Sequence, residues 1–214
     1  MKARYGLATA LRVSDRLVDR AVSTYESAFR LRETDRLEVY LQISADFQRE
    51  GRLDEAMAAL QAIISQHPNH VSAWFHIGTL YLRKGCPPEA CDAFARAQQL
   101  GDSSFECHLG MADALTELEQ REAAAAELRA AVALNPAAHP AHYQLGVCFD
   151  ALGLYDEAVV AFSEAIRLAP KETTYHQSLG FTYDSMGKRE DAVRCFKRAV
   201  ELERRAQSQL GGHR

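Results

Sequence analysis

The residues with the most obvious capacity for chemistry are histidines and cysteines that stand close together in the sequence. The groupings are His67 with His70, His139 with His142, and Cys107 with His108. Imidazole nitrogen and thiolate sulfur are ligands that zinc prefers, so these groupings are candidate metal ligands. However, Pro140 interrupts one histidine pair, and no CxxC motif accompanies them. Because short motifs of this kind often occur by chance, we expect structural histidines and no metal site.

A catalytic site has less support. Cys91, Cys148 and Cys195 fall in segments with helical spacing, and the sequence shows no cationic surroundings that would lower the pKa of their thiols. Glycine-rich phosphate loops and the GxSxG and HExxH motifs are absent from the sequence, and its carboxylates mark out no acid–base pair. We therefore expect a protein that is not an enzyme, with no catalytic residue and no cofactor. The odd count of five irregularly spaced cysteines indicates reduced thiols in the cytoplasm.

Composition and charge exclude further classes. With 47% hydrophobic and 25% charged residues, the chain has the composition of an ordinary soluble protein. Its net charge of −4 does not indicate a protein that binds nucleic acid. No stretch reaches the roughly 18 consecutive apolar residues of a membrane span, and no secretory signal is evident. Residues 1–36 carry eight Lys/Arg against five Asp/Glu, whereas residues 37–214 carry 17 against 24. The basic head and the acidic body could therefore attract each other, within or between chains.

The elements that carry these residues repeat every 34 residues. Blocks 37–70, 71–104, 105–138, 139–172 and 173–206 align without a gap. Positions 4, 7, 8 and 11 of each block form one face of a first helix, and position 4 is held by Tyr40, Trp74, His108, His142 and His176. Position 8 is small: Ser44, Gly78, Ala112, Gly146 and Gly180. In the second half, position 20 is always alanine, and position 24 is bulky: Leu60, Phe94, Leu128, Phe162 and Phe196.

Turn residues separate these helices at constant positions. Position 15 holds a glycine suited to a left-handed turn in four blocks: Gly51, Gly85, Gly153 and Gly187. Position 32 holds a helix-ending proline in three: Pro68, Pro136 and Pro170. Helix, turn and helix over 34 residues is the tetratricopeptide pattern. We therefore predict an all-α solenoid of five full repeats, in which antiparallel helix pairs stack into a right-handed superhelix with a concave and a convex surface.

Three places depart from the pattern. Residues 1–36 form a degenerate N-terminal repeat, either a capping pair or a segment that docks elsewhere. In the second block, Asp102 replaces the proline of position 32. We therefore expect a hinge near residues 100–106, between the repeats of 37–104 and those of 105–214. The alternative is a small change of superhelical pitch. At the C-terminal end, Val193 and Val200 stand where a further repeat would pack. Neighbouring charges solvate this face, or it is a patch that awaits a partner.

Positions 2, 5, 9, 12 and 13 of the first helices should face the groove, which we predict to be a protein-binding surface. Our candidate residues are Leu41, Arg49, Phe75, Leu82, Arg83, Leu109, Asp113, Tyr143, Val147, Asp150, Phe181 and Asp184. Further acids on these faces are Glu38, Asp46, Glu106 and Glu117. Apolar residues among acids suit a basic amphipathic helix. Position 6 lacks the asparagine of a carboxylate clamp and reads Gln42, His76, Gly110, Gln144 and Ser178.

The whole layout resembles the MamA family, the magnetosome-associated tetratricopeptide proteins of magnetotactic bacteria. The N-terminal "RYGLATALRVSDRLVDRAVSTYESAF" and the last two repeats, "QLGVCFDALGLYDEAVVAFSEAIRLAP" and "GFTYDSMGKREDAVRCFKRAVEL", are similar to those of that family. The resemblance implies a cytoplasmic scaffold that is peripherally associated with the magnetosome membrane. It also implies self-assembly, with the N-terminal repeat of one molecule in the concave groove of the next, and a hinge between two groups of repeats.

Taken together, we expect a homo-oligomeric, non-enzymatic scaffold. Its partners would be itself and other magnetosome or membrane-associated proteins, with no nucleic acid and no direct membrane span. The self-assembly segment would act through Tyr5, Leu11, Arg12, Arg16, Arg20 and Tyr25. The alternative is a monomeric adaptor or chaperone that binds a peptide segment of another protein in its groove.

Overall fold

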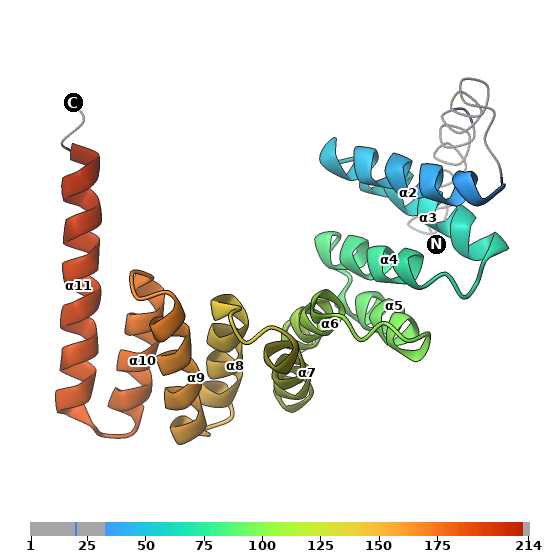
Figure 1. The fold of residues 1–214 in the computed structure, drawn as a ribbon. Coiled ribbons are helices and arrows are strands. Elements are labelled where there is room, and N and C mark those ends of the chain that lie inside the picture. The colour runs from blue at the N-terminus through green and yellow to red at the C-terminus, as the bar shows by residue number, and fades with distance from the viewer. Residues whose placement is uncertain (1–19, 21–32, 212–214) are drawn as a thin grey trace, which may run out of the picture. The chain divides into compact units, whose positions relative to one another are not determined.

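The computed structural model describes residue 20 and residues 33–211, which form helices joined by short turns (Figure 1). The helices are α2 (Glu33–Arg49), α3 (Leu53–Gln66), α4 (Val71–Arg83), α5 (Pro87–Gln99), α6 (Phe105–Glu117), α7 (Arg121–Leu134), α8 (His139–Ala151), α9 (Tyr155–Leu168), α10 (Thr173–Ser185) and α11 (Arg189–Gly211). Each pair from α2–α3 to α10–α11 packs as an antiparallel hairpin. The five consecutive hairpins predicted for residues 37–206 are therefore confirmed.

The chain divides into two compact units, with the boundary between Ser103 and Ser104. This boundary falls within the segment 100–106, where we expect a hinge; the hinge and the division into functional parts stay predictions. The degenerate repeat of residues 1–36 lies outside the described residues, apart from Arg20 and residues 33–36.

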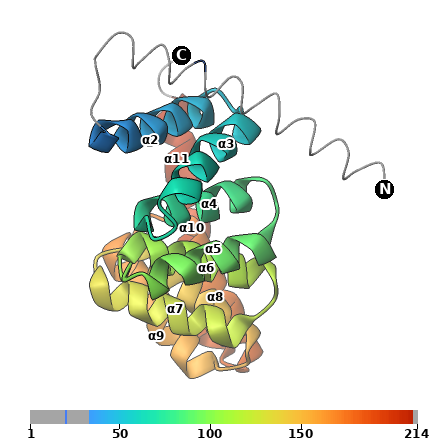
Figure 2. The ribbon, with the colours of Figure 1, turned by 90° about the vertical axis from the view of Figure 1, so that its right-hand side faces the viewer.

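The first unit contains the hairpins α2–α3 and α4–α5, and α3 packs against α4 (Figure 2). Its core consists of the predicted apolar positions of the first two blocks, and Leu60, Ile63, Leu80 and Phe94 are fully buried. The second unit contains α6 to α11, which pack in chain order, α7 on α8 and α9 on α10. Its core is built from the same block positions, with Leu128 and Phe162 each 1% exposed. Each hairpin has apolar surfaces on two opposite sides. Only stacking between neighbouring hairpins buries both surfaces.

The turn inside each hairpin is left-handed at position 15. The four glycines there have φ between 68° and 76°, which confirms the conformation expected from the sequence. The third block has Glu119 at this position, and its φ is 59°. A side chain with a Cβ is strained in this region, so the third hairpin keeps the turn in spite of its residue.

The two helices of a hairpin approach most closely between positions 8 and 24. A Cβ added to Gly78, Gly146 or Gly180 would lie only 2.7–2.8 Å from the phenylalanine ring at position 24 of the same hairpin. The hairpins whose position 8 carries a Cβ, Ser44 and Ala112, have leucine at position 24. Glycine with phenylalanine and a larger residue with leucine are therefore two solutions to the same packing problem.

Candidate protein-binding surface

In three repeats, the position-4 residue ties the first helix to the linker before it. The Nε1–H group of Trp74 donates to the carbonyl of Pro68 at 2.8 Å. The Nε2 groups of His142 and His176 bond the carbonyls of Pro136 and Pro170 at 3.0 and 3.1 Å. The block preceded by Asp102 instead of proline differs: there, the Nδ1 atom of His108 lies 2.6 Å from a carboxylate oxygen of Glu127.

Two further candidate ligands, His70 and His139, also have structural contacts. The Nδ1 atom of His70 accepts a hydrogen bond from the backbone N–H of Ala73 at the start of α4. The Nδ1 atom of His139 lies 2.8 Å from the hydroxyl of Tyr175. Within the part of the chain that the structure describes, no three or more His, Cys, Asp or Glu side chains are grouped so as to hold a metal ion.

The three thiols considered as nucleophiles, and the thiol of Cys107, are poorly placed for nucleophilic chemistry. Burial raises the pKa of the Cys91, Cys148 and Cys195 thiols above the ordinary value, and Cys107 is completely buried. The thiolate is the reactive form of cysteine, so Cys91, Cys148 and Cys195 hold less of it at neutral pH than a free cysteine would.

The predicted groove residues differ widely in exposure. Leu41, Phe75, Leu82, Leu109 and Tyr143 are half-buried. Val147 and Phe181 are 39% and 63% exposed. These two occupy position 9 of α8 and α10, first helices that contact each other in the second unit. They are therefore the predicted apolar residues that a partner can reach most easily.

Three predicted charged residues are hydrogen-bonded between successive first helices. Asp113 accepts from the Gln144 side chain at 2.8 Å, and Asp150 accepts from the Thr182 hydroxyl at 2.7 Å. Arg83 donates to the backbone carbonyl of Gln48 at 3.2 Å. Burial raises the pKa of Asp113, and this rise is opposed by the Gln144 hydrogen bond. These side chains link repeats, whereas Arg49 and Asp184 are exposed.

Tyr143 also contributes to packing between repeats. Its ring stacks on that of Tyr175 with centroids 4.7 Å apart, and its hydroxyl lies 3.4 Å from the hydroxyl of Ser178. A second contact places it 5.7 Å from the ring of Phe162. A substitution at Tyr143 would therefore change the stability of the array as well as any binding surface.

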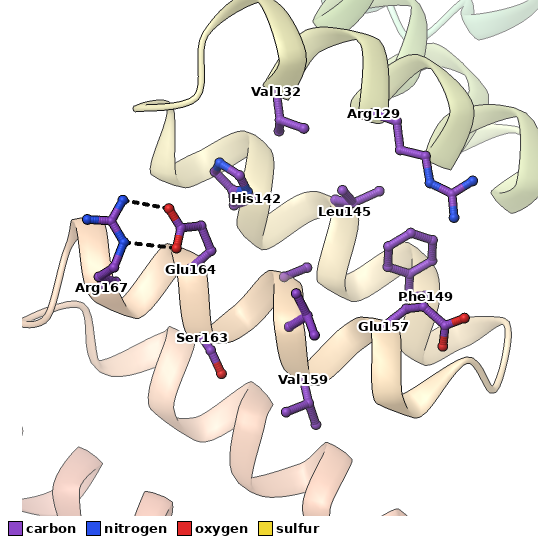
Figure 3. Close-up of a pocket in the computed structure, with 12 residues that line it drawn as sticks. Arg129, Val132, His142, Leu145, Phe149, Glu157, Val159, Ser163, Glu164 and Arg167 are labelled. Atoms are coloured by element: carbon purple, nitrogen blue, oxygen red, sulfur yellow. Dashed lines mark hydrogen bonds and ion pairs between the residues drawn. The ribbon is translucent and has the colours of Figure 1, made fainter.

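A pocket of about 780 Å³ lies elsewhere, between α7, α8 and α9 (Figure 3). Its apolar lining includes Val132, Leu145, Phe149 and Val160, and none of the predicted groove residues contributes to it. Val160 is 70% exposed. The sequence does carry a signal for it: position 22 reads Ala58, Asp92, Ala126, Val160 and Arg194, so only one block has a large apolar residue there.

Charged side chains border this pocket. The Arg167 guanidinium bonds both carboxylate oxygens of Glu164, at 2.9 and 2.6 Å (Figure 3), and this holds the pKa of Glu164 below its usual range. At the other end, the Arg129 guanidinium lies 4.9 Å from the centre of the Phe149 ring. The pocket therefore has an apolar floor bordered by charged side chains.

Most of the predicted self-assembly residues cannot be placed. Tyr5, Leu11, Arg12, Arg16 and Tyr25 lie outside the described residues, and Arg20 is exposed. In the described part of the chain, no helix is both long enough and apolar enough to cross a lipid bilayer.

Comparisons with known proteins agree with this architecture. A family model described as a tetratricopeptide repeat matches residues 42–105 and 109–173, and a second model of the same description matches residues 173–205. The predicted all-α solenoid of tetratricopeptide repeats is confirmed. No curated protein matches the chain.

Several solved structures are similar. A crystal structure of MamA is 29% identical, with a TM-score of 0.75, and the match covers 78% of this chain and 97% of that one. MamA from Desulfovibrio magneticus RS-1 is 27% identical, with a TM-score of 0.75, over 78% of this chain and 95% of its own. YrrB, described as a TPR protein with an unusual peptide-binding site, is 23% identical, with a TM-score of 0.76, over 85% and 92%. The likeness to YrrB concerns the fold alone, whereas the resemblance to MamA found in the sequence is also found in structure.

Proposed function

The chain belongs to the tetratricopeptide repeat family, and on that premise we propose that it is a non-enzymatic protein-interaction scaffold that assembles head to tail. Residues 1–36 of one chain occupy the first-helix groove of its neighbour. By its likeness to MamA, the assembly coats the magnetosome membrane on the cytoplasmic side and recruits other magnetosome proteins. A contact between two different surfaces of the same chain propagates into rings or filaments.

The exposed pair Val147 and Phe181 carries this proposal. Two large apolar side chains occupy the same position of adjoining first helices, α8 and α10. Asp184 is exposed on α10, and Glu117 is exposed on α6, the first helix of the preceding repeat. Apolar residues beside acids suit a segment that is apolar and basic. Residues 1–36 have that composition, with an excess of three positive charges.

Light scattering on the full-length chain and on a chain without residues 1–32 tests the assembly. The truncation leaves α2 whole, and the five hairpins retain their buried core, so the shortened chain should fold. We expect multiples of the chain mass for the full-length protein and a single chain mass for the truncated one. Equal masses would refute self-assembly through this segment, and a single chain mass for both proteins would favour the monomeric adaptor.

A substitution in the groove tests the surface itself. Phe181→Ser should lower the mass of the full-length assembly and change the free energy of unfolding by less than about 1 kcal/mol, because most of the side chain is already exposed. Val160→Ser is the matched control: it removes an equally exposed apolar side chain from the α7–α9 pocket and should leave the mass unchanged. An adaptor would instead show unchanged mass for both variants and weaker partner binding for Phe181→Ser.

A further inference from the structure

The outer face of the last helix, α11, is both apolar and basic. Val193, Lys197, Val200 and Arg204 follow one another at intervals of four, three and four residues, which places them on one side of the helix, and all four are exposed. Val193 and Val200 are 48% and 45% exposed. The four residues, together with Phe196 and Glu201, line a shallow pocket of about 440 Å³. We call these four residues the α11 outer face.

The opposite side of α11 is where the helix meets the array. Ala192, Ala199 and Leu202 are buried there, each at most 8% exposed. The Gln177 side chain of α10 donates to Glu203 at 3.0 Å. Contact with α10 therefore accounts for one side of the helix and leaves the α11 outer face toward solvent.

The repeat explains what kind of element this face accepts. Val193 and Val200 occupy positions 21 and 28, which are Met57 and Ile64 in α3, and Val159 and Ile166 in α9. In those helices, the next first helix, α4 or α10, packs on the second helix. Met57 is 3% exposed, and the other three are half-buried. The α11 outer face thus continues an interface that receives a helix elsewhere in the array, although no further helix of the described residues packs there.

Charge narrows the choice of helix. Residues 189–211 carry six Lys/Arg against four Asp/Glu, whereas residues 104–188 carry five against twelve. Of the acids nearest the face, Glu201 pairs with Arg198 at 3.1 Å, and Glu190 lies beside Arg189 at the border. The helix therefore has a net positive charge. Lys197 lies between the two exposed valines along it, and Arg204 follows the second valine.

We propose that the α11 outer face binds an acidic amphipathic helix of a partner protein, which docks as the first helix of a sixth repeat would. The apolar side of that helix covers Val193 and Val200, and its carboxylates face Lys197 and Arg204. Burial of the valines supplies affinity, and the charges select the partner. This surface and the first-helix groove are on different helices, so either can fail while the other holds.

A synthetic peptide with the α6 sequence, Ser104–Leu118 with Cys107→Ser, is the probe. It is a first helix with three acids, Glu106, Asp113 and Glu117. Fluorescence anisotropy with the full-length protein should show saturable binding that weakens as salt rises, because exposed charges are screened beyond about 10 Å at 0.1 M ionic strength. A control peptide with glutamine at the three acidic positions should bind roughly tenfold more weakly.

Variants of the protein locate the site. Val193→Asp with Val200→Asp should abolish binding, whereas Val160→Asp, on an exposed valine of α9, should leave it unchanged. Lys197→Glu should weaken binding of the acidic peptide roughly tenfold by placing like charges together. A peptide with lysine at the three acidic positions should recover affinity for that variant. Because these side chains are exposed, circular dichroism should show the same helix content in all variants.

Four results would overturn the proposal. One is the absence of saturable binding, and another is equal binding of the acidic and the glutamine peptides. A third is binding to phosphatidylserine vesicles that is lost in the Val193→Asp, Val200→Asp variant while the peptide does not bind, since that outcome assigns the face to a lipid surface. The fourth is a smaller assembly mass for the same variant without peptide binding, which assigns the face to contact between copies.

Discussion

The effects of substitutions at Gly146 and Phe162 on the free energy of unfolding should be strongly coupled, because the Phe162 ring leaves no room for a Cβ at position 146. An ideal Cβ on Gly146 lies 2.7 Å from two ring carbons of Phe162, and carbon atoms prefer about 3.5–4.0 Å. The ring cannot easily move, since it is 1% exposed and lies against Tyr143. Overpacking of this kind costs about 1–3 kcal/mol, and the helix propensity of alanine over glycine returns about 1 kcal/mol. We therefore expect Gly146→Ala to lower the free energy of unfolding by up to about 2 kcal/mol.

Phe162→Leu removes the obstacle. Alone it should destabilise by about 1–2 kcal/mol, less than the ~3–5 kcal/mol of a phenylalanine-to-alanine change. In the double variant, the Cβ of alanine meets the shorter leucine, as it does in the third hairpin, where Ala112 and Leu128 are each 1% exposed. The double variant should be at least as stable as Phe162→Leu. The coupling energy is then about 2 kcal/mol, within the range known for residues in contact.

Urea denaturation followed by far-UV circular dichroism on the wild type, both single variants and the double variant measures this coupling. The reverse cycle is the control: Leu128→Phe should be destabilising beside Ala112, and Ala112→Gly should relieve it. If the two substitutions in either hairpin added without coupling, within about 0.5 kcal/mol, the claim that positions 8 and 24 are chosen together would be wrong.

Two further predictions concern the turn and the interface between repeats. Glu119→Gly should raise the free energy of unfolding by about 0.5–1 kcal/mol, since glycine relieves the strain of a positive φ. Gly153→Ala should lower it by a similar amount. Thermal denaturation measures both changes, and a loss of stability for Glu119→Gly would contradict this explanation of the turn. Because burial raises the pKa of Asp113, ionisation of this carboxyl favours unfolding as pH rises from its ordinary value of 3.8 through the raised value. Asp113→Asn should therefore gain stability relative to the wild type above that window and not below it, and a pH-independent difference in urea midpoint would refute this reasoning.

The helix hairpins were predictable because their signal is local. The helices follow from a stripe at positions 4, 7, 8 and 11, and their ends follow from a glycine at position 15 and a proline at position 32. Each of these signals determines the conformation of residues close to it in the sequence. The same reasoning anticipated that position 8 and position 20 are small. It did not foresee that Ser44 and Ala112 go with leucine and the glycines with phenylalanine, since that choice depends on the distance between two helices.

The binding surface was less predictable for the same reason. Positions 5, 9 and 12 were treated alike, yet Phe181 is exposed while Asp150 bonds Thr182 of the next repeat. Whether a groove position faces solvent or a neighbouring helix depends on contacts between repeats. The α7–α9 pocket had a weak signal in the apolar Val160, which was hidden among the ordinary variation of position 22.

By itself, the sequence determined the helices, their pairing and the turns between them, because those follow from periodicity and backbone conformation within about 34 residues. It also determined that Val193 and Val200 stand at the end of the last repeat. Only the tertiary structure decided which side chains of the array form contacts between repeats and which remain exposed. That division depends on how closely two hairpins approach, and the approach is set by side chains about 34 residues apart in the chain rather than by any one segment.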